Sequence, residues 1–294
     1  MRPIESIAGW AKSSLRSVFD DLVTTAFPSD CRVCNGPLLG FSTLPICERC
    51  EAAIHEQTGS MCRLCGEALD IDMESVRFAG QAGELPSEGL LCTPCRVAPP
   101  MFERAVAYAE YRDELREMVH LLKYERMRGV AGLLGGMLAQ AILTLRADTQ
   151  RELIVVAVPL FPAKQRQRGY NQAELLADAA IAELGHVAPD WKLRRLEGVL
   201  TRRRDTNSQF ELTPHGRRRN VEGAFEIDAS GLPLGREVLL VDDIYTTGAT
   251  ARECARVLRR AGARKVWVAT LARAQTARVA MWDGAGMRTA QGFG

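Results

Sequence analysis

One stretch, residues 238–250, combines the residue types that a sugar phosphate would need. Its apolar start ends in two adjacent carboxylates, Asp242 and Asp243, which are followed by small hydroxyl residues and Gly248. A helical pattern then runs over residues 249–260. A buried strand that leads through such a loop into a helix offers unpaired backbone N–H groups and the positive end of the helix dipole, and both favour a phosphate.

The side chains of the loop support the same interpretation. Thr246, Thr247 and Thr250 add hydroxyl donors, and Gly248 lets the backbone approach a ligand closely. Successive side chains of an extended chain point in different directions, so the two acids can hold neighbouring sugar hydroxyls just before the phosphate. The combination predicts a ribose 5-phosphate site. The alternative is an ordinary strand–turn–helix unit with acidic residues near the start of the helix.

Cysteine content is the strongest departure from ordinary composition. Eight of the nine cysteines form four Cys-x-x-Cys pairs, namely Cys31/Cys34, Cys47/Cys50, Cys62/Cys65 and Cys92/Cys95. Each such turn lets two thiolates reach one ion, and two turns complete a tetrahedron. Pairing in sequence order gives two four-thiolate sites, and a cross-braced arrangement stays open. We expect structural zinc, with redox dithiols and iron–sulfur clusters as alternatives.

The totals exclude several classes of protein. A length of 294 residues favours two domains, and a hydrophobic content of 47% is ample for a packed core. The net charge of +2 is too small to indicate a nucleic-acid partner by itself. No apolar run reaches the length of a membrane span, and the N-terminus lacks a cleavable signal pattern. We therefore expect a cytoplasmic protein, in a compartment whose reducing conditions disfavour disulfides.

The elements that must position these residues follow from hydrophobic periodicity. We expect strands at 104–111, 153–160, 237–241 and 265–271, and helices at 113–124, 130–145, 171–184 and 249–260. Strands that alternate with helices predict an α/β fold with a doubly wound parallel sheet, which binds ligands at the carboxyl ends of its strands.

The same reading divides the chain into four parts. Residues 1–28 predict an amphipathic helix, which we expect to pack on its own protein rather than on a membrane surface. Residues 29–100 form the cysteine-rich module, residues 101–280 the α/β domain, and residues 281–294 a flexible Gly-rich tail.

Three further charged features are candidates for binding. Lys123 and Tyr124 end an expected helix, where a lysine is often present only to complement the helix dipole. Residues 166–172 predict a basic loop in which Arg168 could grip a diphosphate bidentately. Segment 192–219 carries nine basic residues against three acids, which suits single-stranded nucleic acid, a substrate hood or a plain charged face. Its sparse aromatic content offers no evident stacking surface.

Residues from about 18 to 273 resemble the ComF family, in which a cysteine-rich zinc module is joined to a type I phosphoribosyltransferase domain. The motifs that carry the resemblance are the four cysteine pairs, Leu122-Lys123-Tyr124, residues 168–176, Arg204-Asp205-Thr206 with Gln209, Arg219-Asn220 and residues 241–250. They occur in the family's order. Two positions depart from it: Ala157 stands where Pro is common, and Phe161 where His is common.

The resemblance implies a site for 5-phosphoribosyl 1-diphosphate (PRPP) or a related ribose 5-phosphate compound. Asp242 and Asp243 would hold the ribose hydroxyls, with Arg168 as a further catalytic group. The remaining binding residues would be Lys123, Tyr124, Thr246, Thr247, Gly248, Ala249 and Thr250. Magnesium would be carried mostly by the diphosphate and water, and zinc would fill both cysteine sites.

Three hypotheses for the function follow, of which the first rests on the family's usual role in natural competence. The first is a competence-associated protein that binds PRPP and takes part in uptake or handling of single-stranded transforming DNA, with other competence proteins as further partners. The second is an enzyme that transfers phosphoribose from PRPP to a base or an amine. The third is a PRPP-sensing regulatory module without turnover.

Overall fold

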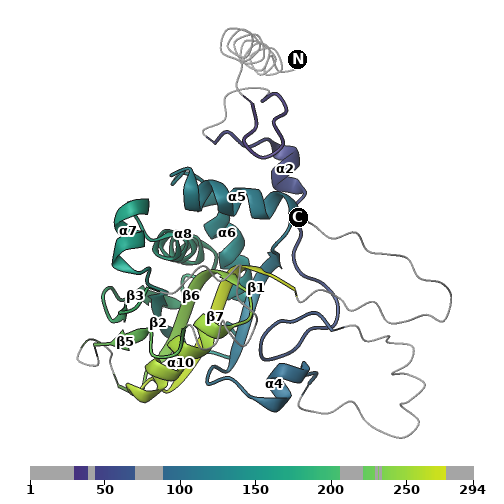
Figure 1. Ribbon diagram of the computed structural model, residues 1–294. Coiled ribbons are helices and arrows are strands. Elements are labelled where there is room, and N and C mark those ends of the chain that lie inside the picture. Colours follow the sequence, from purple (N-terminus) through teal and green to yellow (C-terminus); the bar gives the residue numbers. More distant parts are fainter. Residues whose placement is uncertain are drawn as a thin grey trace, which may run out of the picture.

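The computed structural model describes residues 30–38, 44–69, 89–205, 221–228, 231 and 234–275. The helix expected at 1–28 and the tail expected at 281–294 lie outside these residues, as do residues 206–219 of the basic segment. The centre of the described structure is a parallel sheet with helices on both faces (Figure 1).

The sheet has five strands in the order β1-β7-β6-β2-β3. Their bounds are β1 Arg104–Glu110, β7 Lys265–Arg273, β6 Glu237–Tyr245, β2 Glu152–Ala157 and β3 Lys192–Arg195. All four neighbouring pairs are parallel. Residues 238–241 of the central strand β6 are fully buried and apolar, as a parallel strand covered on both faces must be. The doubly wound α/β sheet predicted from the sequence is confirmed.

Helices cover the two faces of this sheet unequally. On one face α6 (Val130–Leu143) and α8 (Gln172–Val187) pack against each other, with α5 (Asp113–Tyr124) beside α6. On the other lie α10 (Ala249–Arg260) and the short antiparallel pair β4 (Leu200–Arg202) and β5 (Phe225–Ile227). Successive side chains of β6 therefore enter two different cores. Leu239 packs in the core that contains α6 and α8, and Leu240 packs in the core that contains α10.

Two expectations about local structure were wrong. The basic segment at 166–172 is only partly a loop, because α7 spans Pro162–Arg168 and α8 begins at Gln172. A proline in its first turn and a left-handed Gly169, with φ 82°, mark the two ends of α7. In addition, β6 does not end at Val241 but continues to Tyr245, so both acids of the motif lie inside the strand.

The cysteine-rich part packs on the sheet domain at two separate places. Short helices α2 (Glu48–Ala52) and α4 (Thr93–Val97) each begin after the first cysteine of a pair and contain the second. Figure 1 shows α2 beside α5, and α4 well away from it. Cys31 and Cys50 belong to the core of α5 and α6, whereas the last four paired cysteines belong to the core of α10. None of the helices in the described part of the chain is long and apolar enough to cross a membrane.

Candidate functional site

A cavity of about 380 Å³ opens at the carboxyl ends of β6 and β2. Strand β6 carries Asp242 and Asp243 into its wall, and the chain then turns through Thr246–Gly248 into α10. Gly248 has φ 74°, and a Cβ there would lie 2.1 Å from Tyr245 Oη. Only glycine therefore fits this turn, which holds the backbone of the loop close against Tyr245.

Asp243 is the buried member of the acid pair, and it meets a residue far away in the sequence. Lys123 Nζ, at the end of α5, lies 2.9 Å from Asp243 Oδ1. Burial opposes the positive charge of the ammonium group, but the Asp243 carboxylate outweighs burial and raises the pKa of Lys123 above its usual value. This lysine is thus placed in the site and does not merely complement a helix dipole.

Asp243 also retains a free acceptor. Its Oδ2 is buried and has no hydrogen-bond partner within the described residues. Buried polar atoms in folded proteins almost always have a partner, so an unpartnered oxygen at a cavity wall suits a ligand that donates hydroxyl groups. One carboxylate can therefore hold Lys123 with one oxygen and a ligand with the other.

Asp242 as a whole residue is half-buried, but its carboxyl group is surrounded by protein, which disfavours the charged form. Burial, followed by the negative charge of Asp243, raises the pKa of Asp242 to about 7. Its Oδ1 accepts a hydrogen bond from the Asp243 backbone N–H at 2.8 Å. A carboxyl group with a strongly raised pKa beside a second carboxylate is typical of a functional site.

The ends of α5 and α7 form another part of the cavity wall. The Arg168 guanidinium lies 5.3 Å from the ring centroid of Tyr124, and Arg168 also donates to Gln172 Oε1. All three residues line the cavity, so the structure brings Tyr124 and Arg168 to the acid pair, as the sequence-based hypothesis requires. The residues expected to bind a phosphate, 246–250, are called the phosphate loop. Of these, only Thr247 does not line the cavity.

Tyr111, Lys164 and Tyr245 are among the residues that line the cavity but were not assigned to the site from the sequence. Tyr111 directly follows β1, so its position at the carboxyl end of a strand was an available signal. Lys164 lies in α7, just before the segment that was read as a loop, and its ammonium group is 3.0 Å from Asp205 Oδ1. Tyr245 lies within the motif at 241–250, but its aromatic ring indicated no role there beyond burial.

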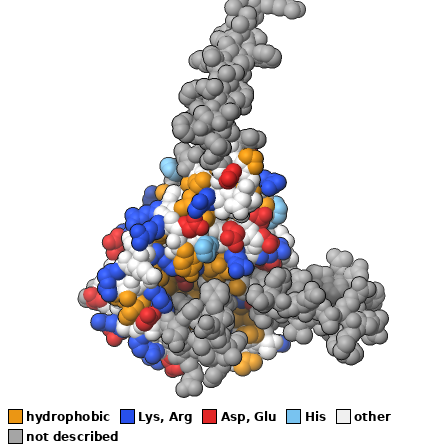
Figure 2. All heavy atoms as spheres, turned by 45° about the horizontal axis from the view of Figure 1, so that its top comes forward, with side chains coloured by type: hydrophobic (Ala, Val, Ile, Leu, Met, Phe, Trp, Pro, Cys, Tyr) orange, Lys and Arg blue, Asp and Glu red, His pale blue; other side chains and the backbone are white. Residues whose placement is uncertain are grey.

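A basic surface adjoins the cavity at α7. Arg126 and Arg128 donate to the backbone carbonyls of Gln167 and Gly169, at 3.2 and 2.9 Å. Lys and Arg side chains gather on the left of the described surface in Figure 2, the side on which Figure 1 draws α7. Exposed Tyr124 stands beside these cations, which we call the α7 basic surface and define as Arg126, Arg128, Lys164, Arg166 and Arg168.

The described basic residues of segment 192–219 have several different partners. Arg195 pairs with Asp178 at 2.5 Å and Arg203 with Glu226 at 2.6 Å, while Arg202 lines the cavity. Arg195 and Arg203 are thus held in surface ion pairs, whereas Arg202 belongs to the cavity.

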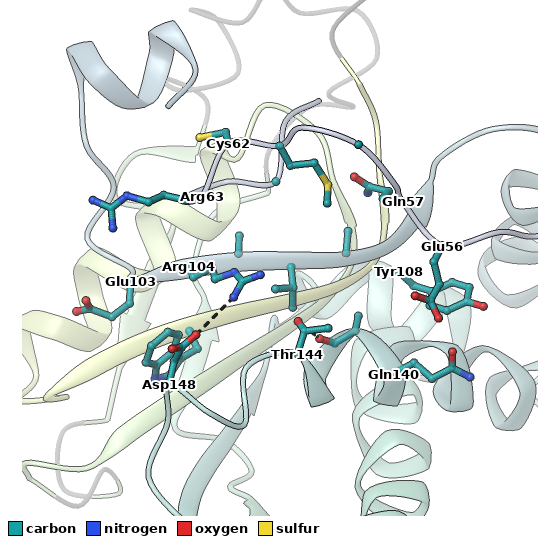
Figure 3. Close-up of a pocket in the computed structure, with 18 of the residues that line it drawn as sticks. Glu56, Gln57, Cys62, Arg63, Glu103, Arg104, Tyr108, Gln140, Thr144 and Asp148 are labelled. Carbon is teal, nitrogen blue, oxygen red and sulfur yellow. Dashed lines mark hydrogen bonds and ion pairs between the residues drawn. The ribbon is translucent and has the colours of Figure 1, made fainter. Parts of the chain in front are cut away.

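A larger hollow, of about 750 Å³, lies elsewhere, beside β1 (Figure 3). Its polar groups include Arg104 and Asp148, which pair with each other at 3.4 Å across the hollow. No residue of the acid pair or the phosphate loop lines it. The smaller cavity remains the candidate site because shifted pKa values and an unpartnered carboxylate oxygen occur there.

The eight paired cysteines form two compact groups in sequence order. Within each group, Cys31/Cys34/Cys47/Cys50 and Cys62/Cys65/Cys92/Cys95, the Sγ atoms all lie within 4.8 Å of one another. The cross-braced alternative is therefore wrong. Sulfur–sulfur distances of 3.9, 3.8 and 3.6 Å match the value of about 3.8 Å that a tetrahedral ion with ligands at about 2.3 Å requires. Both groups fit a four-thiolate metal site.

Comparison with known proteins places this geometry in a family. Residues 172–285 match the model of the phosphoribosyl transferase domain. The chain is 33% identical to the DNA utilization protein YhgH of Salmonella typhimurium over 251 residues, which cover 84% of this chain and 97% of that protein. It is 28% identical to competence protein F of Haemophilus influenzae over 232 residues, or 78% and 96% of the two chains.

The chain belongs to the ComF family. A further member, competence protein ComFC of Streptococcus pneumoniae, is 35% identical over 123 residues, which cover 42% of this chain and 49% of that protein. The matched domain contains the acid pair and the phosphate loop but begins after Lys123, Tyr124 and Arg168. Those three residues join the site through the packing of α5 and α7.

Proposed function

We propose that this ComF-family protein binds PRPP, or a related ribose 5-phosphate compound, in the cavity at the end of β6. The observation that carries the proposal is Asp243, which is buried, held by Lys123 and left with an unpartnered oxygen at the cavity wall. A ribose ring presents two adjacent hydroxyl groups, and this oxygen together with the Asp242 carboxylate is a matching pair of acceptors.

The rest of the cavity would receive the two charged ends of such a ligand. Backbone N–H groups at the start of α10, with the hydroxyl groups of Thr246 and Thr250, suit the 5-phosphate. Arg168 and Lys164 of α7, which also line the cavity, suit the diphosphate, because guanidinium and ammonium groups bind phosphate oxygens. Magnesium bound to the diphosphate would neutralise part of its charge.

Titration calorimetry with PRPP and magnesium tests this assignment. Asp243→Asn should weaken binding about tenfold or more, since a charged acceptor of the ribose is lost. Asp190→Asn is the matched control, because Asp190 is an exposed acid paired with Arg146 away from the cavity. PRPP affinity that is undiminished in the Asp243 variant would contradict the role given to the acid pair.

We propose zinc as the occupant of both cysteine groups, since four thiolates at tetrahedral spacing favour that ion. Such closed sites build structure and leave no open coordination position for chemistry.

We further propose that the protein acts in the cytoplasm in handling single-stranded DNA, with other competence proteins as partners. Two relatives are named for DNA utilization and for competence. The α7 basic surface supports this role because it combines cations with the exposed ring of Tyr124, on which a base can stack.

Binding of a fluorescent oligonucleotide at several salt concentrations tests the DNA proposal. Replacement of Arg126, Arg128 and Arg166 by Gln should weaken binding and flatten its dependence on salt, because each lost phosphate contact lowers the slope by about 0.7. Replacement of Arg202, Arg203 and Arg204 is the comparison for the basic segment. Binding that neither triple variant changes would count against a direct DNA contact.

Transfer of phosphoribose to a base or an amine is a second candidate function. Asp242, with a pKa of about 7, can accept a proton near neutral pH. Departure of diphosphate from PRPP would leave positive charge on the anomeric carbon, which the acid pair could stabilise. Diphosphate release with a panel of acceptors tests this function. PRPP binding without any release would favour the regulatory module.

A further inference from the structure

The second cysteine group is connected to the phosphate loop by a buried arginine. Arg273, the last residue of β7, donates through Nη1 to the Cys65 carbonyl oxygen at 2.6 Å and through Nη2 to Cys65 Sγ at 3.6 Å. It also forms an ion pair with Glu67. Only 4% of the Arg273 surface is exposed, and its buried guanidinium group binds the first turn of that group, Cys62–Cys65.

The same guanidinium faces the loop side of the sheet. Its central carbon lies 4.4 Å from the ring centroid of Tyr245, the residue opposite Arg273 in the pairing of β6 with β7. The ring of Phe102 closes on Tyr245 edge-on, with centroids 6.4 Å apart. The Tyr245 ring thus contacts both the Arg273 guanidinium and the Phe102 ring. A cation over the face of an aromatic ring is attracted to that ring.

Tyr245 in turn sets the path of the loop. A Cβ at Gly248 would meet its Oη at 2.1 Å, so the loop backbone crosses directly against the phenol. The Ala274 N–H also donates to the Tyr245 carbonyl oxygen at 2.9 Å. A displacement of this ring would leave the backbone of Thr246–Gly248 without its support.

The second turn of the same cysteine group holds the helix that follows the loop. Arg252 of α10 donates to the Ala98 carbonyl oxygen at 2.6 Å and to Cys95 Sγ at 3.6 Å. One four-thiolate site therefore links two turns of chain, of which one is bonded to the end of β7 and the other to α10. The loop lies between those two anchors.

We propose that Arg273 is a positioning residue, which acts through Tyr245 to hold the phosphate loop in its binding shape and connects that shape to the second cysteine group. That this loop binds a phosphate rests on the function proposed above. That Arg273 keeps the loop ordered in the free protein is independent of that function. The chain thereby uses a structural metal site to brace a ligand site, without placing the metal in contact with the ligand.

Hydrogen–deuterium exchange of the free full-length protein tests the proposal. Arg273→Lys keeps a positive charge but loses the planar fork that reaches Cys65 and Glu67 together. Exchange in residues 246–251 should rise about tenfold, as expected when one buried hydrogen bond to a charged group is lost. Metal content should stay at the wild-type value, because all eight thiolates remain. PRPP affinity should fall by a similar factor.

Two further variants separate positioning from general loss of stability. Arg264→Lys is the matched control, because Arg264 forms an ion pair with buried Glu237 at the opposite end of β6 and should leave loop exchange unchanged. Tyr245→Leu removes the aromatic ring and should loosen the loop as Arg273→Lys does.

Loop exchange that stays at the wild-type rate in Arg273→Lys, or that rises equally in Arg264→Lys, would overturn the proposal. If the wild type binds no PRPP while Arg273→Lys still loosens the loop, the proposed function fails and the positioning role stands.

Discussion

The ion pair between Lys123 and Asp243 is the residue-scale feature that most constrains the site. Its side chains are 15% and 7% exposed, so both charges are largely removed from water. Such a pair is weak evidence for stability, because desolvation offsets most of the attraction. It does hold Asp243 in one orientation, which leaves the unpartnered oxygen at the cavity wall.

Loss of one partner should therefore be costly. We expect Lys123→Met to lower the free energy of unfolding in urea by about 3 kcal/mol, because Asp243 is left buried and unpaired. The double variant Lys123→Met with Asp243→Asn should recover part of that loss. Losses that simply add in the double variant would show that the two side chains do not interact.

Asp242 should make stability depend on pH in a defined direction. Burial, followed by the charge of Asp243, raises its pKa from 3.8 to about 7, so the folded state binds this proton more tightly than the unfolded chain. The free energy of unfolding that this group contributes therefore falls as pH rises from about 4 to about 7, and the loss is complete above that range. Asp242→Asn should be more stable than wild type at about pH 8 and not at about pH 4. A difference in urea unfolding that does not change with pH would disprove this assignment.

At the scale of elements, the site depends on the direct passage from β6 through a short loop into α10. The sheet buries β6 on both faces, and the loop turns where Gly248 adopts a left-handed conformation against Tyr245. Little of the loop can move independently, since both of its ends belong to packed elements.

Substitution of Gly248 should show how tight this turn is. Gly248→Ala should lower the free energy of unfolding by about 2 kcal/mol or more, because left-handed strain and the clash with Tyr245 add. Gly235→Ala is a matched control, since Gly235 has φ 71° and no atom within 4 Å of the position of a Cβ. It should lose only about 1 kcal/mol, from strain alone. If thermal unfolding shows the same loss of stability in both variants, the clash with Tyr245 does not contribute.

At the scale of the whole molecule, the cysteine-rich part and the sheet domain share their cores. We propose a module over 29–100 and a domain over 101–280, but each of the two apolar cores contains both cysteines and sheet residues. The two parts should consequently unfold together, since neither core is complete without the other part.

Removal of one metal should therefore affect the entire chain. Cys47→Ser should reduce the zinc content by about one ion and lower the midpoint of a single thermal transition, because metal binding energy at such a site is folding energy. Cys254→Ala is the control, since Cys254 is buried in α10 and belongs to neither group. It should retain the full zinc content. A separate early transition that leaves the main one unchanged would mean that the module unfolds alone.

The sequence by itself determined the features that depend on neighbours along the chain. Helices at 113–124 and 249–260 have the predicted bounds, and the parallel sheet follows from buried apolar strands between helices. The four cysteine turns and the acid pair before the phosphate loop are likewise local patterns. Periodicity reports burial of one element against a core, and a short motif needs no distant partner to be recognised.

Only the tertiary structure decided which distant residues meet. The family resemblance placed Lys123 and Asp243 in one site, but nothing in the sequence indicated that they form an ion pair. Likewise, nothing around Arg273 indicated Cys65 or Tyr245. The pairing of the cysteine turns and the division of the basic segment between surface and site were also open until the fold was known. These contacts depend on how several elements pack together at the same time. No local stretch of sequence contains that information, because the partners lie in distant parts of the chain.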